Sequence, residues 1–209
     1  MDQSPKKTEQ GKKRRKASCS QNAMQQSMVR LMKSVPYSDI TVTMIANDAC
    51  INRKTFYAHY PTKEKLLFAM LYEMFDDLFS SFLYKKDPPV DVPDAAKLKE
   101  DAQIFLRKLI CYEERLQALL TDETLGFSLS VADQVVLNCW KDIAFLNETG
   151  DTIFQKLYVK MIRGFFMSLI SAWMDLEKKS FDENVDVLVR IMKHSYADLF
   201  SYTKATPES

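Results

Sequence analysis

Side chains that donate and accept hydrogen bonds crowd the short stretch from residue 52 to residue 63. They are Asn52, Arg53, Lys54, Thr55, Tyr57, His59, Tyr60 and Lys63, and Thr41 and Thr43 precede them closely. Asn, Arg, Lys and Thr can hydrogen-bond the edges of bases in the major groove, and basic and hydroxyl side chains hold phosphates. The chemistry that these residue types predict is recognition of double-stranded DNA.

Two short helices must position these side chains. Thr41 and Asn52 are residues that cap helix N-termini, because their side-chain oxygens accept hydrogen bonds from unpaired backbone N–H groups. Pro61 ends the second helix, Thr62 caps a third helix, and Glu64 lies in its first turn, where the helix dipole favours a negative charge. Two short helices joined by a tight turn form a helix-turn-helix. An ordinary pair of helices with a solvated polar face would show the same pattern, so the pattern alone leaves both alternatives open.

The order of residues resembles the DNA-binding domain of the TetR family of bacterial transcriptional regulators. Three motifs carry the resemblance: I-T-V-x-x-I-A at 40–46, T-F-Y-x-H-Y at 55–60 and P-T-K-E-K-L-L at 61–67. The resemblance covers roughly residues 20–70. It implies that Phe56 belongs to the core, while Tyr57 and His59 hold phosphates. It also implies that Lys63 holds a further phosphate.

Two positions depart from the family pattern. Cys50 stands in the turn, where the family usually has glycine, and Lys54 stands in the second helix at a position where glycine is frequent. If Cys50 adopts a left-handed conformation, it costs about 1–3 kcal/mol. Lys54 adds a charge to the recognition helix and changes what that helix can read.

Composition and periodicity indicate an all-α fold. The 209 residues include only 4 glycines, and long runs of apolar residues recur at helical spacing. We expect an N-terminal three-helix helix-turn-helix domain followed by an all-helical ligand-binding and dimerisation domain, about nine helices in all. Residues 1–65 carry 13 Lys and Arg against 5 Asp and Glu, whereas residues 66–209 carry 16 against 23. A basic part joined to an acidic part fits a nucleic-acid-binding module attached to a domain that avoids nucleic acid.

Three segments are predicted along the chain: a disordered basic tail over 1–17, the DNA-binding domain over 18–66 and the regulatory domain over 67–209. The tail contains K-K-R-R-K at 12–16 and could follow DNA phosphates, or it could only increase solubility. Ser18-x-x-Gln21 matches a capping box, which predicts that the first helix begins there.

Further helices are expected in the regulatory domain. Their predicted ranges are 62–84, a segment from Asp94 with a break near 113–114, 127–146, 153–176 and 182–203. The helix over 153–176 is apolar on nearly every side, so it must be buried on every side. We therefore expect the last two helices to form a homodimer interface, as they do in TetR-type regulators. A monomer with a thick core is the alternative.

Cysteine usage and the apolar windows exclude several classes of protein. Cys19, Cys50, Cys111 and Cys139 are widely spaced and predict free, buried thiols in a reducing cytoplasm, with no disulfide framework, metal site or cofactor. The most apolar window, 164–174, is too short to span a membrane.

An enzyme is the competing class, but only two histidines are present and no catalytic set is recognisable. A helical protein-interaction adaptor is a third class, which would need neither the basic N-terminal part nor the donors at 52–63.

The function that the resemblance implies is regulation of transcription from a palindromic DNA operator. Most such proteins repress, and they release the operator when a small-molecule effector enters the C-terminal domain, although some activate. Aromatic residues among the C-terminal helices are candidate pocket residues. They are Phe105, Trp140, Tyr158, Phe165 and Trp173, and for each of them plain core packing is the alternative.

Overall fold

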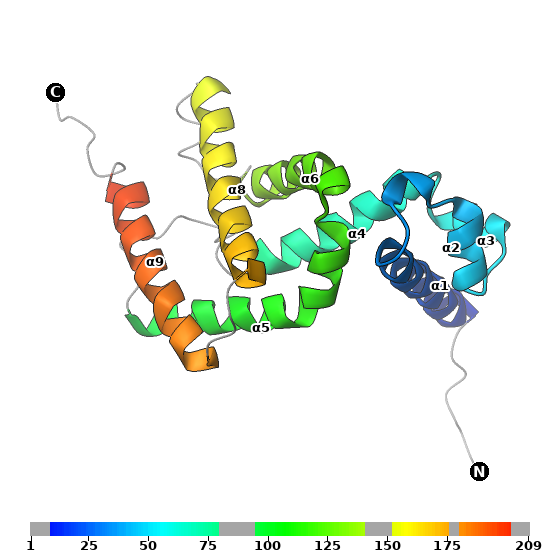
Figure 1. Cartoon of the computed structure of the whole chain (residues 1–209), viewed down its shortest axis with the longest axis horizontal. Coiled ribbons are helices and arrows are strands. Elements are labelled where there is room, and N and C mark those ends of the chain that lie inside the picture. Colours follow the sequence, from blue (N-terminus) through cyan, green and yellow to red (C-terminus); the bar gives the residue numbers. More distant parts are fainter. Residues whose placement is uncertain (1–8, 80–94, 141–151, 176–179, 202–209) are drawn as a thin grey trace, which may run out of the picture. The chain divides into compact units, whose positions relative to one another are not determined.

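The computed structural model describes residues 9–79, 95–140, 152–175 and 180–201, and every regular element in these ranges is helical (Figure 1). The elements are α1 (Glu9–Met32), the 3-10 helix η1 (Tyr37–Asp39), α2 (Val42–Asp48), α3 (Arg53–His59), α4 (Lys63–Phe79), α5 (Ala95–Leu119), α6 (Asp122–Trp140), α8 (Thr152–Asp175) and α9 (Phe181–Ser201). The predicted all-α fold class is confirmed. None of these helices is long and apolar enough within the described ranges to cross a membrane. The expected helix start at Asp94 lies outside the described residues.

The first helix begins earlier than its capping box predicts. It starts at Glu9, so residues 9–17 are helical rather than a disordered tail, and the predicted start at Ser18 is wrong. Apart from Gly11, this segment consists of Glu, Gln, Lys, Arg and Ala, which are strong helix formers even where no apolar stripe marks the helix. The periodicity of buried residues, which begins at Met24, therefore located only the packed part of the helix.

Two boundaries in the middle of the chain also differ from expectation. The break considered near 113–114 does not occur, because α5 continues to Leu119. The next helix begins at Asp122, before the predicted start at Phe127. At its first turn the backbone N–H of Thr121 donates to the hydroxyl of Thr124 over 3.2 Å, and the acidic residues of this turn suit the helix dipole.

The described chain forms two compact units. Unit 1 contains the residues up to Leu71 together with Glu114–Ser128, and unit 2 contains Tyr72–Glu113 and the residues from Leu129 onward. The helices α4, α5 and α6 therefore each contribute residues to both units. The predicted division between residues 66 and 67 stays a prediction, and the sequence did not indicate that 114–128 would pack with the N-terminal helices.

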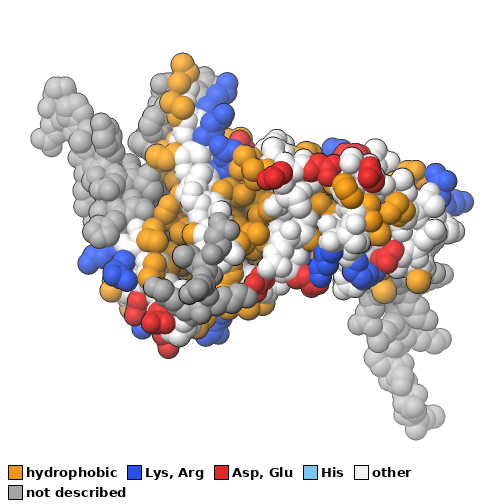
Figure 2. Space-filling view, viewed as in Figure 1, with side chains coloured by type: hydrophobic (Ala, Val, Ile, Leu, Met, Phe, Trp, Pro, Cys, Tyr) orange, Lys and Arg blue, Asp and Glu red, His pale blue; other side chains and the backbone are white. Residues whose placement is uncertain are grey.

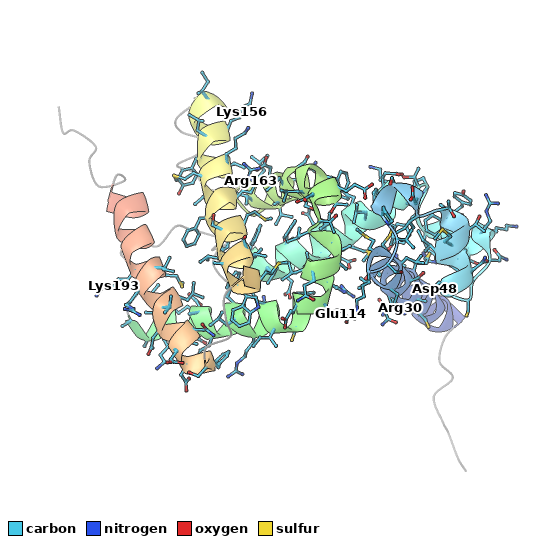
Figure 3. All side chains as sticks on the ribbon, in the orientation of Figure 1. Arg30, Asp48, Glu114, Lys156, Arg163 and Lys193 are labelled. Carbon is cyan, nitrogen blue, oxygen red and sulfur yellow. The ribbon has the colours of Figure 1, made fainter. Side chains whose placement is uncertain are left out.

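Unit 1 is held together by buried apolar side chains and by links from α1 to α2. Met24 and Met28 are fully buried on α1, as their helical spacing predicts. The buried Ser27 hydroxyl donates to the backbone oxygen of Ile45 over 3.1 Å. On the surface, the guanidinium of Arg30 lies 2.6 Å from the carboxylate of Asp48, and Figure 3 shows the two labelled side chains close together. These links fix α1 behind the helix-turn-helix.

Unit 2 has an aromatic centre. The ring of Phe79 on α4 stacks on Phe166 of α8 with centroids 4.5 Å apart, and Phe75 stacks on Phe79 at 5.5 Å. An ion pair of 3.1 Å between Arg163 and Asp133 links α8 to α6. Apolar side chains are buried along the whole described length of α4, from Leu66 to Phe79.

Candidate nucleic-acid interface

Both helices of the predicted helix-turn-helix are capped by the residues that the sequence indicates. The hydroxyl of Thr41 accepts the backbone N–H of Met44 over 3.2 Å at the start of α2. The side-chain oxygen of Asn52 accepts the backbone N–H of Thr55 over 2.9 Å at the start of α3. The bounds of α3 agree with the predicted cap at Asn52 and the predicted stop at Pro61, because a cap and a proline are local signals that no distant contact has to supply.

The turn between α2 and α3 is tight and contains a residue in the left-handed backbone conformation. The N–H of Ile51 donates to the oxygen of Ala46 over 2.9 Å, and the N–H of Cys50 donates to Asn47 over 3.1 Å. This is the Schellman arrangement, which places its left-handed residue directly after the helix cap. Cys50 occupies that place with φ 53°. The turn therefore keeps the geometry that glycine usually serves, at the expense of backbone strain.

The outer face of α3 presents basic and aromatic side chains to solvent. Arg53, Lys54 and Tyr57 are exposed, whereas Phe56 is fully buried, as the family resemblance implies. Tyr57 is 48% exposed, which is high for an aromatic side chain, and its ring lies 6.0 Å from the guanidinium of Arg53. A donor-rich, convex helical face of this kind can enter a major groove.

The remaining predicted DNA contacts differ in their accessibility. Thr43 is exposed on α2, and Thr55 and His59 are half-buried on α3. The Thr41 hydroxyl and the Asn52 side-chain oxygen are occupied as helix caps. Thr43 and the exposed residues of α3 are thus the side chains best placed to contact bases.

Two predicted contacts are not supported by the geometry. Tyr60 is 7% exposed, and its ring lies 6.1 Å from the ring of Phe56, so it belongs to the core. The ammonium group of Lys63 donates to the backbone oxygens of Tyr37, Ser38 and Ile40 over 2.7, 3.0 and 2.8 Å. Because an ammonium group has three N–H donors, these contacts leave Lys63 no donor for a phosphate.

The candidate effector residues lie in the second unit. Phe105 is fully buried and Phe165 is half-buried, and both rings contact Phe166 at centroid distances of 6.1 and 5.6 Å. Burial raises the pKa of the Tyr158 hydroxyl to about 12. The indole N–H of Trp173 is buried and has no hydrogen-bond partner among the described residues. The side chain of Trp140 lies outside the described part of the structure, and an effector pocket stays a prediction.

The cysteines differ from expectation in burial. Cys19, Cys50 and Cys111 are free thiols, but all three are exposed. The prediction that they are buried is wrong, because Cys50 lies in a surface turn and Cys111 lies on the solvent side of α5. The side chain of Cys139 lies outside the described residues.

Sequence reasoning missed one residue that bears on this interface. Glu123, on α6, hydrogen-bonds the backbone of η1, just before α2. An acidic residue in the first turn of a helix has no local signal for such a contact, and its partners lie more than 80 positions earlier.

A comparison with known protein families agrees with the family that the motifs indicate. Residues 28–70 match the family described as bacterial regulatory proteins, tetR family. No curated protein matches the chain.

Similar solved structures include a tetR-family transcriptional regulator from Streptomyces coelicolor, at 18% identity over 90% of this chain and 83% of that one, with a TM-score of 0.49. The fatty acid degradation regulator FadR from Bacillus halodurans is 18% identical over 83% of this chain and 94% of that one, with a TM-score of 0.49. The TetR family repressor AlkX from Dietzia is 18% identical over 84% of this chain and 97% of that one, with a TM-score of 0.48.

The match at 28–70 spans the capped helix-turn-helix and the start of α4. The resemblance stated from the motifs is therefore confirmed over these residues, which match the tetR family of bacterial regulatory proteins.

Proposed function

We propose that the chain binds a palindromic DNA operator as a homodimer and represses transcription from it, with α3 of each protomer lying in the major groove. The observation that carries this proposal is the outer face of α3, where Arg53, Lys54 and Tyr57 are exposed together. An isolated helix needs no such set of donors for its own stability. The bidentate guanidinium of Arg53 suits the edge of guanine, and the hydroxyl of Tyr57 suits a phosphate.

Exposed apolar side chains on α8 support the dimer. Ile153 is 70% exposed, Leu157 is 63% exposed and Met161 is 47% exposed, and their spacing places them in one row along the helix. Figure 2 shows hydrophobic side chains at the surface of this helix beside basic ones. Ile191 on α9 is a further exposed apolar residue. A row of this kind is costly to leave in water, and a second copy of the chain would cover it.

Release by a small-molecule effector belongs to the same proposal. The helices α4 and α6 contribute to both units, so a ligand that moves them in unit 2 would act on unit 1. The aromatic residues around Phe166 are the proposed lining. An activator of the same family is the alternative, and the sign of regulation depends on where the operator lies relative to a promoter.

Selection of DNA from a random-sequence pool tests the proposal. We expect the full chain to enrich a duplex with two half-sites related by two-fold symmetry, as a symmetric dimer requires. Transcription from a promoter that overlaps this duplex should fall when the protein is added. A Lys99→Ala variant, which removes an exposed charge from unit 2, should select the same duplex. Enrichment of no sequence, with equal affinity for all duplexes, would reject the proposal.

A further inference from the structure

The short helix η1 cannot cap its own N-terminus. The residue at its N-cap is Pro36, which makes no side-chain capping hydrogen bond. The N–H groups of Asp39 and Ile40 bond within the turn, to Pro36 and to Tyr37. The N–H groups of Tyr37 and Ser38 therefore need a partner from another element.

Glu123 supplies that partner from the first turn of α6. One of its carboxylate oxygens accepts the N–H of Tyr37 over 2.8 Å, and the other accepts the N–H of Ser38 over 2.6 Å. Such charge-assisted bonds are stronger than neutral ones, and two of them fix both the position and the orientation of the carboxylate.

Lys63 holds the opposite end of the same helix. It lies at the first position of α4, and its ammonium group donates to three backbone oxygens of η1 and of Ile40. The ammonium group also lies 4.5 Å from the centroid of the Tyr37 ring. An anion at the N-terminus and a cation at the C-terminus both match the dipole of the helix. We call this arrangement of Glu123, η1 and Lys63 the η1 clamp.

The η1 clamp adjoins the DNA-binding helices at two places along the chain. Ile40 is buried and directly precedes Thr41, the residue that caps α2. Lys63 begins α4 four positions after His59, the last residue of α3. A shift of η1 therefore acts on the start of α2 and on the end of the recognition helix.

The geometry points to Glu123 as a positioning residue for the DNA-binding surface, which makes operator affinity depend on the position of α6. This inference rests on the proposed operator binding. The helix α6 starts at Asp122 in unit 1 and continues through Ser128 into unit 2. When α6 moves, its Glu123 carboxylate pulls on η1, and η1 displaces α2 and the start of α4. Without that carboxylate, movement of α6 no longer reaches the recognition helix by this route.

The first test measures hydrogen exchange at the backbone amides of Tyr37 and Ser38. We expect Glu123→Gln to accelerate exchange at both, because an amide side chain has one acceptor oxygen where the carboxylate has two, and the bond to that uncharged oxygen is weaker. Asp122→Asn is the matched control, since it removes the same charge from an exposed neighbour in the same turn. Unchanged exchange in Glu123→Gln would show that the carboxylate does not hold η1 in solution.

The second test asks whether α6 acts through Glu123. Val135 lies on α6 in unit 2 and is fully buried, so Val135→Leu overpacks its surroundings and displaces the helix. We expect this change to alter affinity for the selected operator by at least about fivefold in the wild-type background, a usual size for coupling between sites. In the Glu123→Gln background the same change should alter affinity less than about twofold, because the coupling energy of the pair is then lost.

Two outcomes would overturn the inference. One is an equal change of affinity in both backgrounds, which would show that α6 acts through another route. The other is a wild-type affinity that responds neither to Val135→Leu nor to the larger Val135→Phe. Circular dichroism confirms that each variant is folded.

The failure of operator binding itself is a different result. If the wild-type chain enriches no duplex, the proposed function fails, while the exchange rates still show whether η1 responds to α6. In that case Val135→Leu should change exchange at Tyr37 and Ser38 in the wild-type background and leave it unchanged in Glu123→Gln. Equal exchange in the wild type, Val135→Leu, Glu123→Gln and the double variant would then overturn the η1 clamp as well.

Discussion

Lys63 and Cys50 illustrate how local geometry decides the role of a residue. Lys63 has the residue type and the position of a phosphate contact, yet three backbone oxygens surround its ammonium group and occupy its donors. Cys50 has the residue type of a buried thiol, yet it occupies the left-handed position of a surface turn. In both cases the neighbouring backbone, rather than the side-chain chemistry, determines what the residue does.

Cys50→Gly should stabilise the protein. A left-handed conformation costs a residue with a Cβ atom about 1–2 kcal/mol, and glycine avoids this cost. Glycine also makes the unfolded chain more flexible, which offsets about 0.4–1 kcal/mol. The expected net gain in the free energy of unfolding is about 0.5–1 kcal/mol, and urea denaturation measures it.

Cys50→Ala is the control for this prediction. It removes the thiol but keeps the Cβ atom and therefore the strain, so its free energy of unfolding should match the wild type. A Cys50→Gly protein that is no more stable than Cys50→Ala would mean that the turn carries no strain of this kind.

At the scale of elements, sequence reasoning succeeded where the signals are local. The bounds of α2 and α3 depend on Thr41, Asn52 and Pro61, which act on their immediate neighbours, and the structure keeps these bounds. The predicted start of α1 is wrong because good helix formers extend this helix beyond its buried stripe. The predicted start of α6 is wrong because the first turn is stabilised by the bond between Thr121 and Thr124 and by its acidic residues, which carry no apolar periodicity. The contact of Glu123 with η1 joins elements far apart in the chain, and one sequence without related sequences contains no signal for such a pair.

The link between α1 and α2 should appear in the titration of Asp48. The hydrogen bond from Arg30 holds the pKa of the Asp48 carboxyl below its ordinary value, and Ser27 contributes to the same effect. Because this pKa is lower in the folded than in the unfolded state, the stabilisation is present above the unfolded pKa. It is lost as the pH falls through the folded pKa. In Arg30→Met the pKa of Asp48 should rise toward that of an ordinary aspartate, as carboxyl-carbon NMR can measure.

The effect of this pair on stability should be small. Both side chains are partly exposed, and ion pairs of this kind contribute about 0–1 kcal/mol. Lys33→Met removes a charge directly after α1 without touching Asp48 and serves as the control. If Asp48 titrates identically in the wild type and in Arg30→Met, the ion pair does not persist in solution.

The basic segment at the start of the chain should contribute to DNA binding through phosphates. It carries Lys6, Lys7, Lys12, Lys13, Arg14, Arg15 and Lys16. If three residues per protomer touch phosphates, a dimer gains about six contacts, and log affinity falls more steeply with log salt by roughly five units. Deletion of residues 1–16 should therefore flatten the salt dependence and weaken binding most at low salt.

Titrations of the full and the shortened chain at several salt concentrations measure this slope. Preference between operator and random DNA should change little, because phosphate contacts carry no direct sequence information. Parallel lines for the two proteins would mean that the segment does not contact DNA and serves solubility instead.

At the scale of the whole molecule, the exposed row on α8 should mediate self-association. Leu157→Asp should dissociate the dimer, because it would bury an unpaired charge at the interface. Leu157→Met, which keeps an apolar side chain of similar size, should remain dimeric. Light scattering distinguishes the two, and a wild-type chain that is monomeric at micromolar concentration would contradict the dimer.

The choice of Leu157 follows from the structure rather than from the sequence. Leu188 on α9 is 5% exposed and belongs to the core of its own protomer. A charge at Leu188 would unfold unit 2 and would not report on association. Exposure within one protomer thus separates interface candidates from core residues, which apolar periodicity alone cannot do.

The most direct measurement of the central claim compares Arg53→Ala and Tyr57→Phe on the selected operator and on random DNA. If Arg53 reads a base, Arg53→Ala should lose about 1–3 kcal/mol on the operator, relax preference at one position of each half-site, and change affinity for random DNA much less. Tyr57→Phe should weaken binding to the operator and binding to random DNA by a similar factor, because the hydroxyl contacts a phosphate. The free energy of unfolding of this variant should stay unchanged. Equal losses on both DNAs for Arg53→Ala, together with unchanged binding for Tyr57→Phe, would contradict the claim that the exposed face of α3 reads the operator.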